Sequence, residues 1–158
     1  MTDTVATLFI DGQWVPSSSG ETRTVICPAD QSEVGVVSEA TAEDVERAIL
    51  AARRAFESRV WADRPAAERG DFLLRVADRL QERKDEFARA EAFDTGKRLV
   101  EAEGDMDDIT ACFRYFGKVA GQNPGRLVDA GDESVISRVV HEPIGVSGMI
   151  TPWNFPLL

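Results

Sequence analysis

The N-terminal part of the chain carries short apolar runs separated by turn residues. The runs over residues 8–10 and 13–15 flank Asp11-Gly12, a pair that favours the type I′ turn of a two-residue β-hairpin. Two further strands are predicted over residues 24–26 and 34–37. The spacing therefore predicts a β-rich beginning built from short segments.

Helical spacing follows. Thr41 is suited to cap a first helix, because its hydroxyl can accept from the first-turn amides, and Glu43 and Asp44 then lie where the helix dipole favours acids. The apolar residues that then recur at helical spacing are Val45, Ala48, Ile49, Ala52 and Phe56.

Three more helices are expected. Pro65 is suited to the first turn of the second helix, the third should lie around residues 85–92, and the fourth over residues 99–120 with Gly121 as its terminator. The buried positions are expected to be Phe72, Leu73, Val76 and Leu80 in the second helix, and Ala102, Met106, Ile109, Phe113, Phe116 and Ala120 in the fourth.

Beyond residue 124 the pattern becomes extended again. Strands are predicted over residues 126–128 and 134–142, and the small apolar run 144–150 fits a buried strand of a parallel sheet. Such a strand needs partner strands and covering helices, which the few residues after it cannot supply. We therefore expect an α/β chain that is incomplete.

Composition narrows the class of protein. A chain of 158 residues with 43% hydrophobic and 29% charged residues has the composition of an ordinary soluble domain, with no segment apolar enough to span a bilayer. The first residues lack a signal-peptide pattern, so a cytoplasmic location is the expectation. A net charge of −10 argues against nucleic acid binding, because a phosphate backbone would repel the chain.

The cysteines and the histidine do not form a metal-binding pattern. Cys27, Cys112 and His141 have no recognised ligand spacing. Cys112 lies in an apolar helical pattern and is expected to be a buried, inert thiol, and Cys27, which precedes Pro28, is also expected to be structural.

The last residues carry the candidate chemistry. Pro152 and Pro156 bracket Trp153-Asn154-Phe155, and each proline restricts the backbone on both sides of its peptide bond. Asn154 is thus expected in a stiff loop at the C-terminal end of a strand, the position where open α/β sheets bind ligands. The alternative for a lone asparagine is a turn residue that bonds its own backbone.

Two stretches, Glu142-Pro143-Ile144-Gly145-Val146 and Pro152-Trp153-Asn154-Phe155-Pro156, closely resemble the E-P-x-G-V…P-W-N-F-P signature of the aldehyde dehydrogenase superfamily. Glu91-Ala92-Phe93-Asp94-Thr95-Gly96-Lys97 is similar to the family's E-x-x-D-T-G-K segment, and this form is most similar to the betaine-aldehyde and aminoaldehyde subgroup. Further matches in the same order are Phe9-Ile10-Asp11-Gly12-Gln13-Trp14, Pro28-Ala29 and Ala40-Thr41-Ala42-Glu43-Asp44-Val45.

The resemblance implies oxidation of an aldehyde to a carboxylic acid. A cysteine thiolate attacks the aldehyde, hydride passes to NAD or NADP, and water releases the acid. Asn154 matches the family's oxyanion donor, a neutral amide aimed at developing charge. Ile150, Thr151, Pro152 and Trp153, together with Asn154, match positions on the nicotinamide side of the cofactor site.

The resemblance also implies a monovalent cation, potassium or sodium. The matching positions are Val25 and Ile26, through their carbonyls, and Asp94, through its carboxylate; Cys27 stands where asparagine is usual. On the residues alone, Asp94 is equally well read as an acid at a helix end or turn.

The family architecture implies a division of the chain. Residues 1–123 form the hairpin and helical part of the cofactor-binding lobe, residues 124–142 a strand arm for oligomer contacts, and residues 143–158 the first strand and oxyanion loop of the Rossmann-like cofactor domain. A homo-oligomer, dimer or tetramer, is implied for the complete enzyme.

The resemblance places the nucleophilic cysteine and the general-base glutamate beyond Leu158, so the chain should be inactive alone. The competing hypothesis is a truncated, non-catalytic structural or interaction module. Such a module could pair with another chain through an exposed strand edge over residues 134–140.

Overall fold

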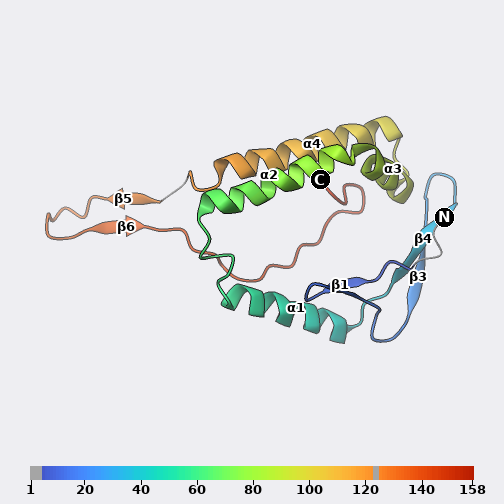
Figure 1. Ribbon diagram of the computed structural model, residues 1–158, viewed down its shortest axis with the longest axis horizontal. Helices are drawn as coiled ribbons and strands as arrows, with labels where there is room; N and C mark the ends of the chain where they lie inside the picture. The colour runs from blue at the N-terminus through green and yellow to red at the C-terminus, as the bar shows by residue number, and fades with distance from the viewer. Residues whose placement is uncertain (1–4, 123–124) are drawn as a thin grey trace.

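A computed structural model describes residues 5–122 and 125–158. Short antiparallel strand pairs lie at the two ends of the molecule and beside its first helix, the other helices pack together, and a long irregular segment leads to the C-terminus (Figure 1). In chain order the elements are β1 (Leu8–Ile10), β2 (Gln13–Val15), β3 (Thr22–Ile26), β4 (Glu33–Ser38), α1 (Ala42–Glu57), α2 (Ala66–Glu82), α3 (Lys84–Thr95), α4 (Leu99–Val119), β5 (Arg126–Val128) and β6 (Ser137–Val139).

The N-terminal strands confirm the sequence prediction. β1 pairs with β2 in an antiparallel register that sets Leu8 opposite Val15. Asp11 and Gly12 between them have φ values of 54° and 77°, as a type I′ turn requires. β3 and β4 pair in the same way and extend further than predicted, since β3 begins at Thr22 and β4 runs from Glu33 to Ser38.

The start of α1 is fixed by a capping box. Thr41 Oγ1 accepts from the Asp44 amide at 3.2 Å, and Asp44 Oδ2 accepts from the Thr41 amide at 3.0 Å. The same carboxylate accepts from the Ser18 amide at 3.0 Å, so the turn before β3 is attached to the helix. The amides of Thr41 and Ser18 hold the pKa of Asp44 well below its usual range.

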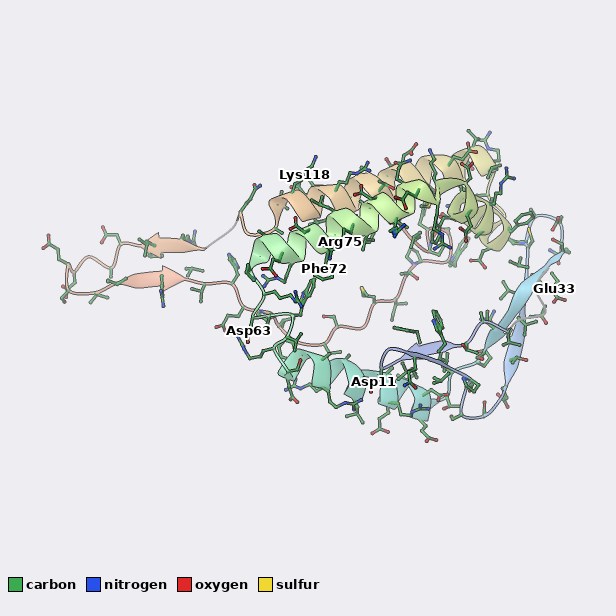
Figure 2. The ribbon with its side chains drawn as sticks, in the orientation of Figure 1. Asp11, Glu33, Asp63, Phe72, Arg75 and Lys118 are labelled. Atoms are coloured by element: carbon green, nitrogen blue, oxygen red, sulfur yellow. The ribbon has the colours of Figure 1, made fainter. Side chains whose placement is uncertain are left out.

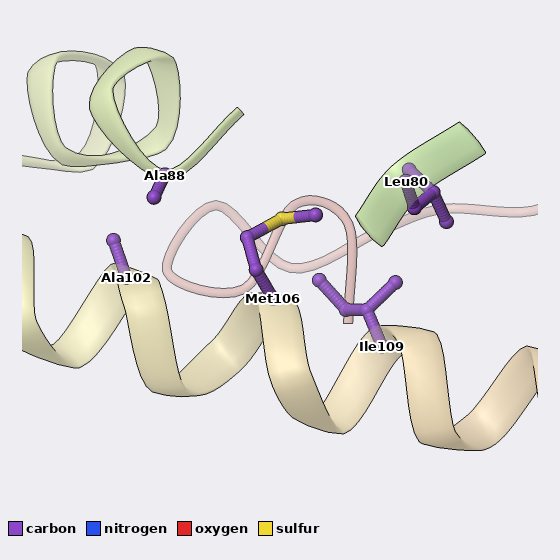
Figure 3. Packing of buried hydrophobic residues seen from close by; sticks show 5 residues of the cluster. All are labelled: Leu80, Ala88, Ala102, Met106 and Ile109. Carbon is purple, nitrogen blue, oxygen red and sulfur yellow. The ribbon is translucent and has the colours of Figure 1, made fainter. Parts of the chain in front are cut away.

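The hydrophobic core belongs to α2, α3 and α4, which we call the helical unit. α2 and α4 lie side by side, and α3 closes one end (Figure 1). The buried cluster consists of Leu80, Ala88, Ala102, Met106 and Ile109 (Figure 3). Its members on α4 and Leu80 on α2 were all predicted to be buried.

The predicted inner face of α2 is only partly right. Phe72 and Val76 are more than a third exposed, and Phe72 instead packs its ring edge-on against Trp61 at 5.1 Å and under Arg75 (Figure 2). Phe116 of α4 is likewise exposed. The buried residues of α2 are Gly70, Ala77 and Leu80, two of them small.

Two glycines let α2 and α4 approach closely. A Cβ on Gly70 would lie 2.4 Å from the Gly117 carbonyl oxygen, and one on Gly117 would lie 2.8 Å from Leu74 Cδ2. The Cβ on Gly70 meets backbone and could not be accommodated without moving a helix, whereas the one on Gly117 would require the Leu74 side chain to shift. This contact turns α2 so that Phe72 and Val76 lie at its side.

Of the two predictions for the cysteines, one is confirmed and one is wrong. Cys27 is buried as predicted, whereas Cys112 is exposed, so its predicted burial is wrong. The buried stripe of α4 passes through Met106, Ile109 and Thr110, and Cys112 lies on another side of the helix.

The C-terminal residues depart most from the prediction. β5 and β6 form an antiparallel hairpin that extends away from the helices (Figure 1), and β6 is much shorter than the predicted 134–142. Residues 144–150 form no strand, and Ile150 is 99% exposed. A strand requires a hydrogen-bonded partner, and no described strand lies beside this run.

The predicted boundary between residues 123 and 124 lies outside the described residues. Within residues 5–122 and 125–158, no helix is long and apolar enough to cross a membrane.

Candidate active site

The loop around Asn154 lies against the junction between α3 and α4. A cavity of about 460 Å³ separates the two, lined on one side by Thr95, Gly96 and Lys97 and on the other by Trp153, Asn154 and Phe155. Glu101 and Asp105 of α4 complete its wall. The fold thus brings together two motifs that are far apart in the sequence.

The loop is a short turn in which the Phe155 amide donates to the Pro152 carbonyl at 3.3 Å. Trp153 is largely exposed, while Phe155 turns more of its ring toward the helices. The Asn154 side chain makes no hydrogen bond to any residue that the structure describes. The observed geometry therefore does not favour the alternative of an asparagine that satisfies its own backbone.

The junction opposite the loop is shaped by Gly96. This residue ends α3 in the left-handed region with φ of 74°, and its amide donates to the Ala92 carbonyl at 2.9 Å. A Cβ there would lie 2.7 Å from Pro28 Cγ and 3.1 Å from the Ala29 amide nitrogen. Glycine is required on both counts, and the contact joins the end of α3 to the segment after β3.

Lys97 follows directly and turns back toward the helices. Its Nζ donates to Glu91 Oε1 at 2.6 Å and to Asp105 Oδ2 at 2.5 Å, and all three side chains are at most 15% exposed. Burial lowers the pKa of Lys97, but the hydrogen bonds to Asp105 and Glu91 outweigh burial and raise it above the ordinary value. Lys97 is therefore a fixed cation at neutral pH.

The same ammonium group contacts the loop. Lys97 Nζ lies 4.4 Å from the centroid of the Phe155 ring, within the range of a cation–π interaction. Glu91 contributes a further feature, because its Oε2 is buried without a hydrogen-bond partner among the described residues. The loop is thus docked on a buried charge cluster.

The expected cofactor positions are only partly gathered at this cavity. Trp153 and Asn154 line it, whereas Ile150, Thr151 and Pro152 precede it as exposed residues. They form one continuous stretch that leads into the loop.

The expected cation ligands lie in two elements that meet. Val25 and Ile26 flank a register shift at the end of β3, and Asp94 is an exposed acid in the last turn of α3. A cavity of about 270 Å³ where these elements meet is lined by Cys27, Ala29 and neighbouring residues, and not by the expected ligands. Within the described residues, no three His, Cys, Asp or Glu side chains cluster as metal ligands.

Comparison with known proteins decides the family. The sequence model of a protein family described as "Aldehyde dehydrogenase family" matches residues 14–158 of this chain. The chain belongs to the aldehyde dehydrogenase family.

Individual relatives agree with this assignment. Betaine aldehyde dehydrogenase of Bacillus subtilis (strain 168) is 42% identical over 152 residues, and aminoaldehyde dehydrogenase 2 of Zea mays is 44% identical over 157 residues. Each alignment covers 96% of this chain, and the chain spans about 31% of the length of these relatives.

The fold agrees as well. A solved structure of betaine aldehyde dehydrogenase from Staphylococcus aureus in complex with NAD+ has 46% identity and a TM-score of 0.93, covering 96% of this chain and 30% of that one. The predicted fold class is confirmed: this aldehyde dehydrogenase chain has the N-terminal part of the family fold, with helices and small antiparallel sheets.

Sequence reasoning missed part of the site. In the sequence, Lys97 stands out only as the last residue of the D-T-G-K match, and no motif marks Asp105. The sequence signal for this cluster is a lysine between two predicted helices, with an acid at position 91 before it and another at position 105 after it. Charges with that spacing usually lie on solvated faces, so the pattern alone does not indicate a buried cluster.

Proposed function

We propose that the complete protein containing this aldehyde dehydrogenase chain oxidises an aldehyde to a carboxylic acid with NAD as the oxidant. The observation that carries the proposal is the Asn154 amide, which has no described hydrogen-bond partner and lies in a proline-bracketed loop beside a cavity. Betaine aldehyde and aminoaldehydes are the proposed substrate class, because relatives with those names are 42% and 44% identical to this chain.

In this proposal Asn154 is the catalytic residue of the chain. Its side-chain amide donates to the aldehyde oxygen as negative charge develops there during thiolate attack. An amide is suited to this task because it donates hydrogen bonds and carries no charge. The thiolate and the general base are supplied by residues beyond Leu158, so the chain alone is inactive.

The residues before Asn154 form the proposed cofactor contact. Ile150, Thr151, Pro152 and Trp153 lie on the nicotinamide side, where they offer an apolar surface and backbone groups. When bound, NAD accepts the hydride that leaves the substrate carbon. NAD is proposed over NADP because the similar solved structures are complexes with NAD+.

A potassium or sodium ion remains part of the proposal. The carbonyls of Val25 and Ile26 and the carboxylate of Asp94 would supply oxygen ligands, which suit a hard cation. The register shift between Val25 and Ile26 supports this assignment, because an irregular ladder leaves carbonyls available for other partners. The ion would join the end of β3 to the end of α3.

Cytoplasmic location and homo-oligomer formation stay predictions. The interaction-module hypothesis is the second candidate, and the observation that favours it is the β5–β6 hairpin, whose residues Leu127 and Ile136 are exposed. The two hypotheses make opposite predictions about enzymatic activity.

The experiment that separates them is an assay of the full-length protein. With NAD+ and betaine aldehyde or an aminoaldehyde, it should form acid and NADH in equal amounts, and the 158-residue chain should form neither. Absence of NADH formation from the folded full-length protein with every aldehyde tested would favour the module.

A further inference from the structure

The two prolines stiffen the ends of the loop but do not fix its centre. Pro152 fixes its own φ and restricts Thr151, and Pro156 fixes its own φ and restricts Phe155. The φ and ψ angles of Trp153 and Asn154 are not limited by either ring, and among the backbone hydrogen bonds of the described residues only the 3.3 Å bond from the Phe155 amide to the Pro152 carbonyl closes around them. That bond shapes the turn but does not attach it to the helices, so a contact outside the turn is needed to set the direction of the Asn154 amide.

Phe155 is the residue that can supply this contact. Its ring is the less exposed of the two aromatic side chains beside Asn154, at 39% against 84% for Trp153. It lies over the Lys97 ammonium, whose own position is fixed by two carboxylates on different helices. A ring held there fixes the backbone immediately after Asn154.

We infer that Lys97, held between Glu91 and Asp105, is a positioning residue that anchors the Asn154 loop through the Phe155 ring. The inference rests on the proposed role of Asn154 for its catalytic consequence. Lys97 does not touch the reacting atoms; it acts by limiting the directions that the Asn154 amide can take. The two carboxylates keep the ammonium charged and stop it from turning toward solvent.

The charges of the cluster indicate that Lys97 does more than join two helices. The cluster contains two carboxylates, those of Glu91 and Asp105, and one ammonium group, and burying a charge is costly unless it is paired. A lysine that served only to join α3 to α4 would need one carboxylate, as Lys84 does with Asp107 at 2.6 Å. Lys97 instead bridges both helices and the loop.

Lys84 provides the matched control. It is also an α3 lysine paired with an α4 acid, but it makes no hydrogen bond, ion pair or cation–π contact with residues 150–158. Lys97→Met and Lys84→Met each remove one ammonium and keep an unbranched side chain. Phe155→Leu removes the ring while leaving Lys97 in place.

The test uses the full-length enzyme and two readouts. Hydrogen exchange of the residue 151–157 amides should become at least several-fold faster in Lys97→Met and Phe155→Leu, and stay at the parent rate in Lys84→Met. In steady-state kinetics, Lys97→Met should lower kcat roughly 3- to 30-fold with KM little changed, as loss of a desolvated cation–π contact predicts.

A cycle with Asn154 separates positioning from general damage. In the Asn154→Ala background, Lys97→Met should lower kcat no further, because the amide that Lys97 positions is absent. Unchanged loop exchange in Lys97→Met, or an equal loss of kcat in both backgrounds, would overturn the inference. If Asn154→Ala alone keeps the parent kcat, the proposed oxyanion role fails, and loop exchange alone then decides whether Lys97 anchors the loop.

Discussion

The helical unit and residues 143–158 are both rich in apolar residues, yet those of the helical unit include a buried core while most of those in residues 143–158 are exposed. Met106 in α4 is 1% exposed, while Met149 is 89% exposed. The apolar side chains of the helical unit are buried because α2, α3 and α4 pack against one another. The terminal segment pairs with no described strand, and most of its apolar side chains stay exposed; its Asn154 loop meets the helical unit, where the Phe155 ring lies over Lys97.

This difference shows that apolar content predicts burial only when a covering element is present. The solved relative extends well beyond the part that this chain matches, since the match covers 30% of it. Its high structural agreement over 96% of this chain indicates that the open path of the terminal segment is that of the family fold.

The largest effect is expected in the core. Met106→Ala removes a fully buried side chain and should destabilise the chain by about 2–5 kcal/mol, because it leaves a cavity. Met149→Ala makes the same chemical change at an exposed position and should cost less than about 0.5 kcal/mol. Urea unfolding of both variants measures the contrast, and equal losses would show that the two regions do not differ as described.

A smaller effect is expected at the helix contact. Gly70→Ala pushes a methyl group into the Gly117 carbonyl and should cost about 1–3 kcal/mol. Gly104→Ala, in the same helical unit, meets nothing within 4 Å and should stabilise α4 by up to about 1 kcal/mol. Thermal unfolding gives the sign of each change; a stabilised Gly70→Ala chain would contradict the close approach.

The smallest effect concerns acid sensitivity at the start of α1. The pKa of Asp44 is lowered in the folded chain, so its stabilising contribution is present above the unfolded pKa of about 4 and is lost as pH falls toward the folded pKa. The melting temperature of Asp44→Asn should therefore fall less steeply below about pH 4 than that of the parent. Parallel curves for the two proteins over that range would argue against the capping role.

Local signals in the sequence predicted the regular elements well. Asp11-Gly12, Thr41 and Gly121 act through nearest neighbours, so their turn, cap and helix end follow from residue type alone. Asp44 was expected only as a first-turn acid. Its bond to Ser18 depends on how β3 and α1 come together, and no periodicity encodes that.

Tertiary contacts account for the errors. Gly70 weakens a helix prediction when read alone, but in the fold it sets which face of α2 meets α4. The run 144–150 has the composition of a parallel strand, and composition cannot state whether a partner is present. Asn154 was identified through its motif, whereas Lys97 required the fold, because its partners Glu91, Asp105 and Phe155 come from three separate segments.

The most direct test of the account is kcat for Asn154→Ala in the full-length enzyme. Loss of one oxyanion donor should lower kcat by about 10²–10³, with KM little changed and the melting temperature at the parent value. Asn154→Asp should be at least as impaired, because it sets a like charge beside the oxyanion. A folded Asn154→Ala enzyme whose kcat falls less than about tenfold would contradict the assignment of this loop as the oxyanion site.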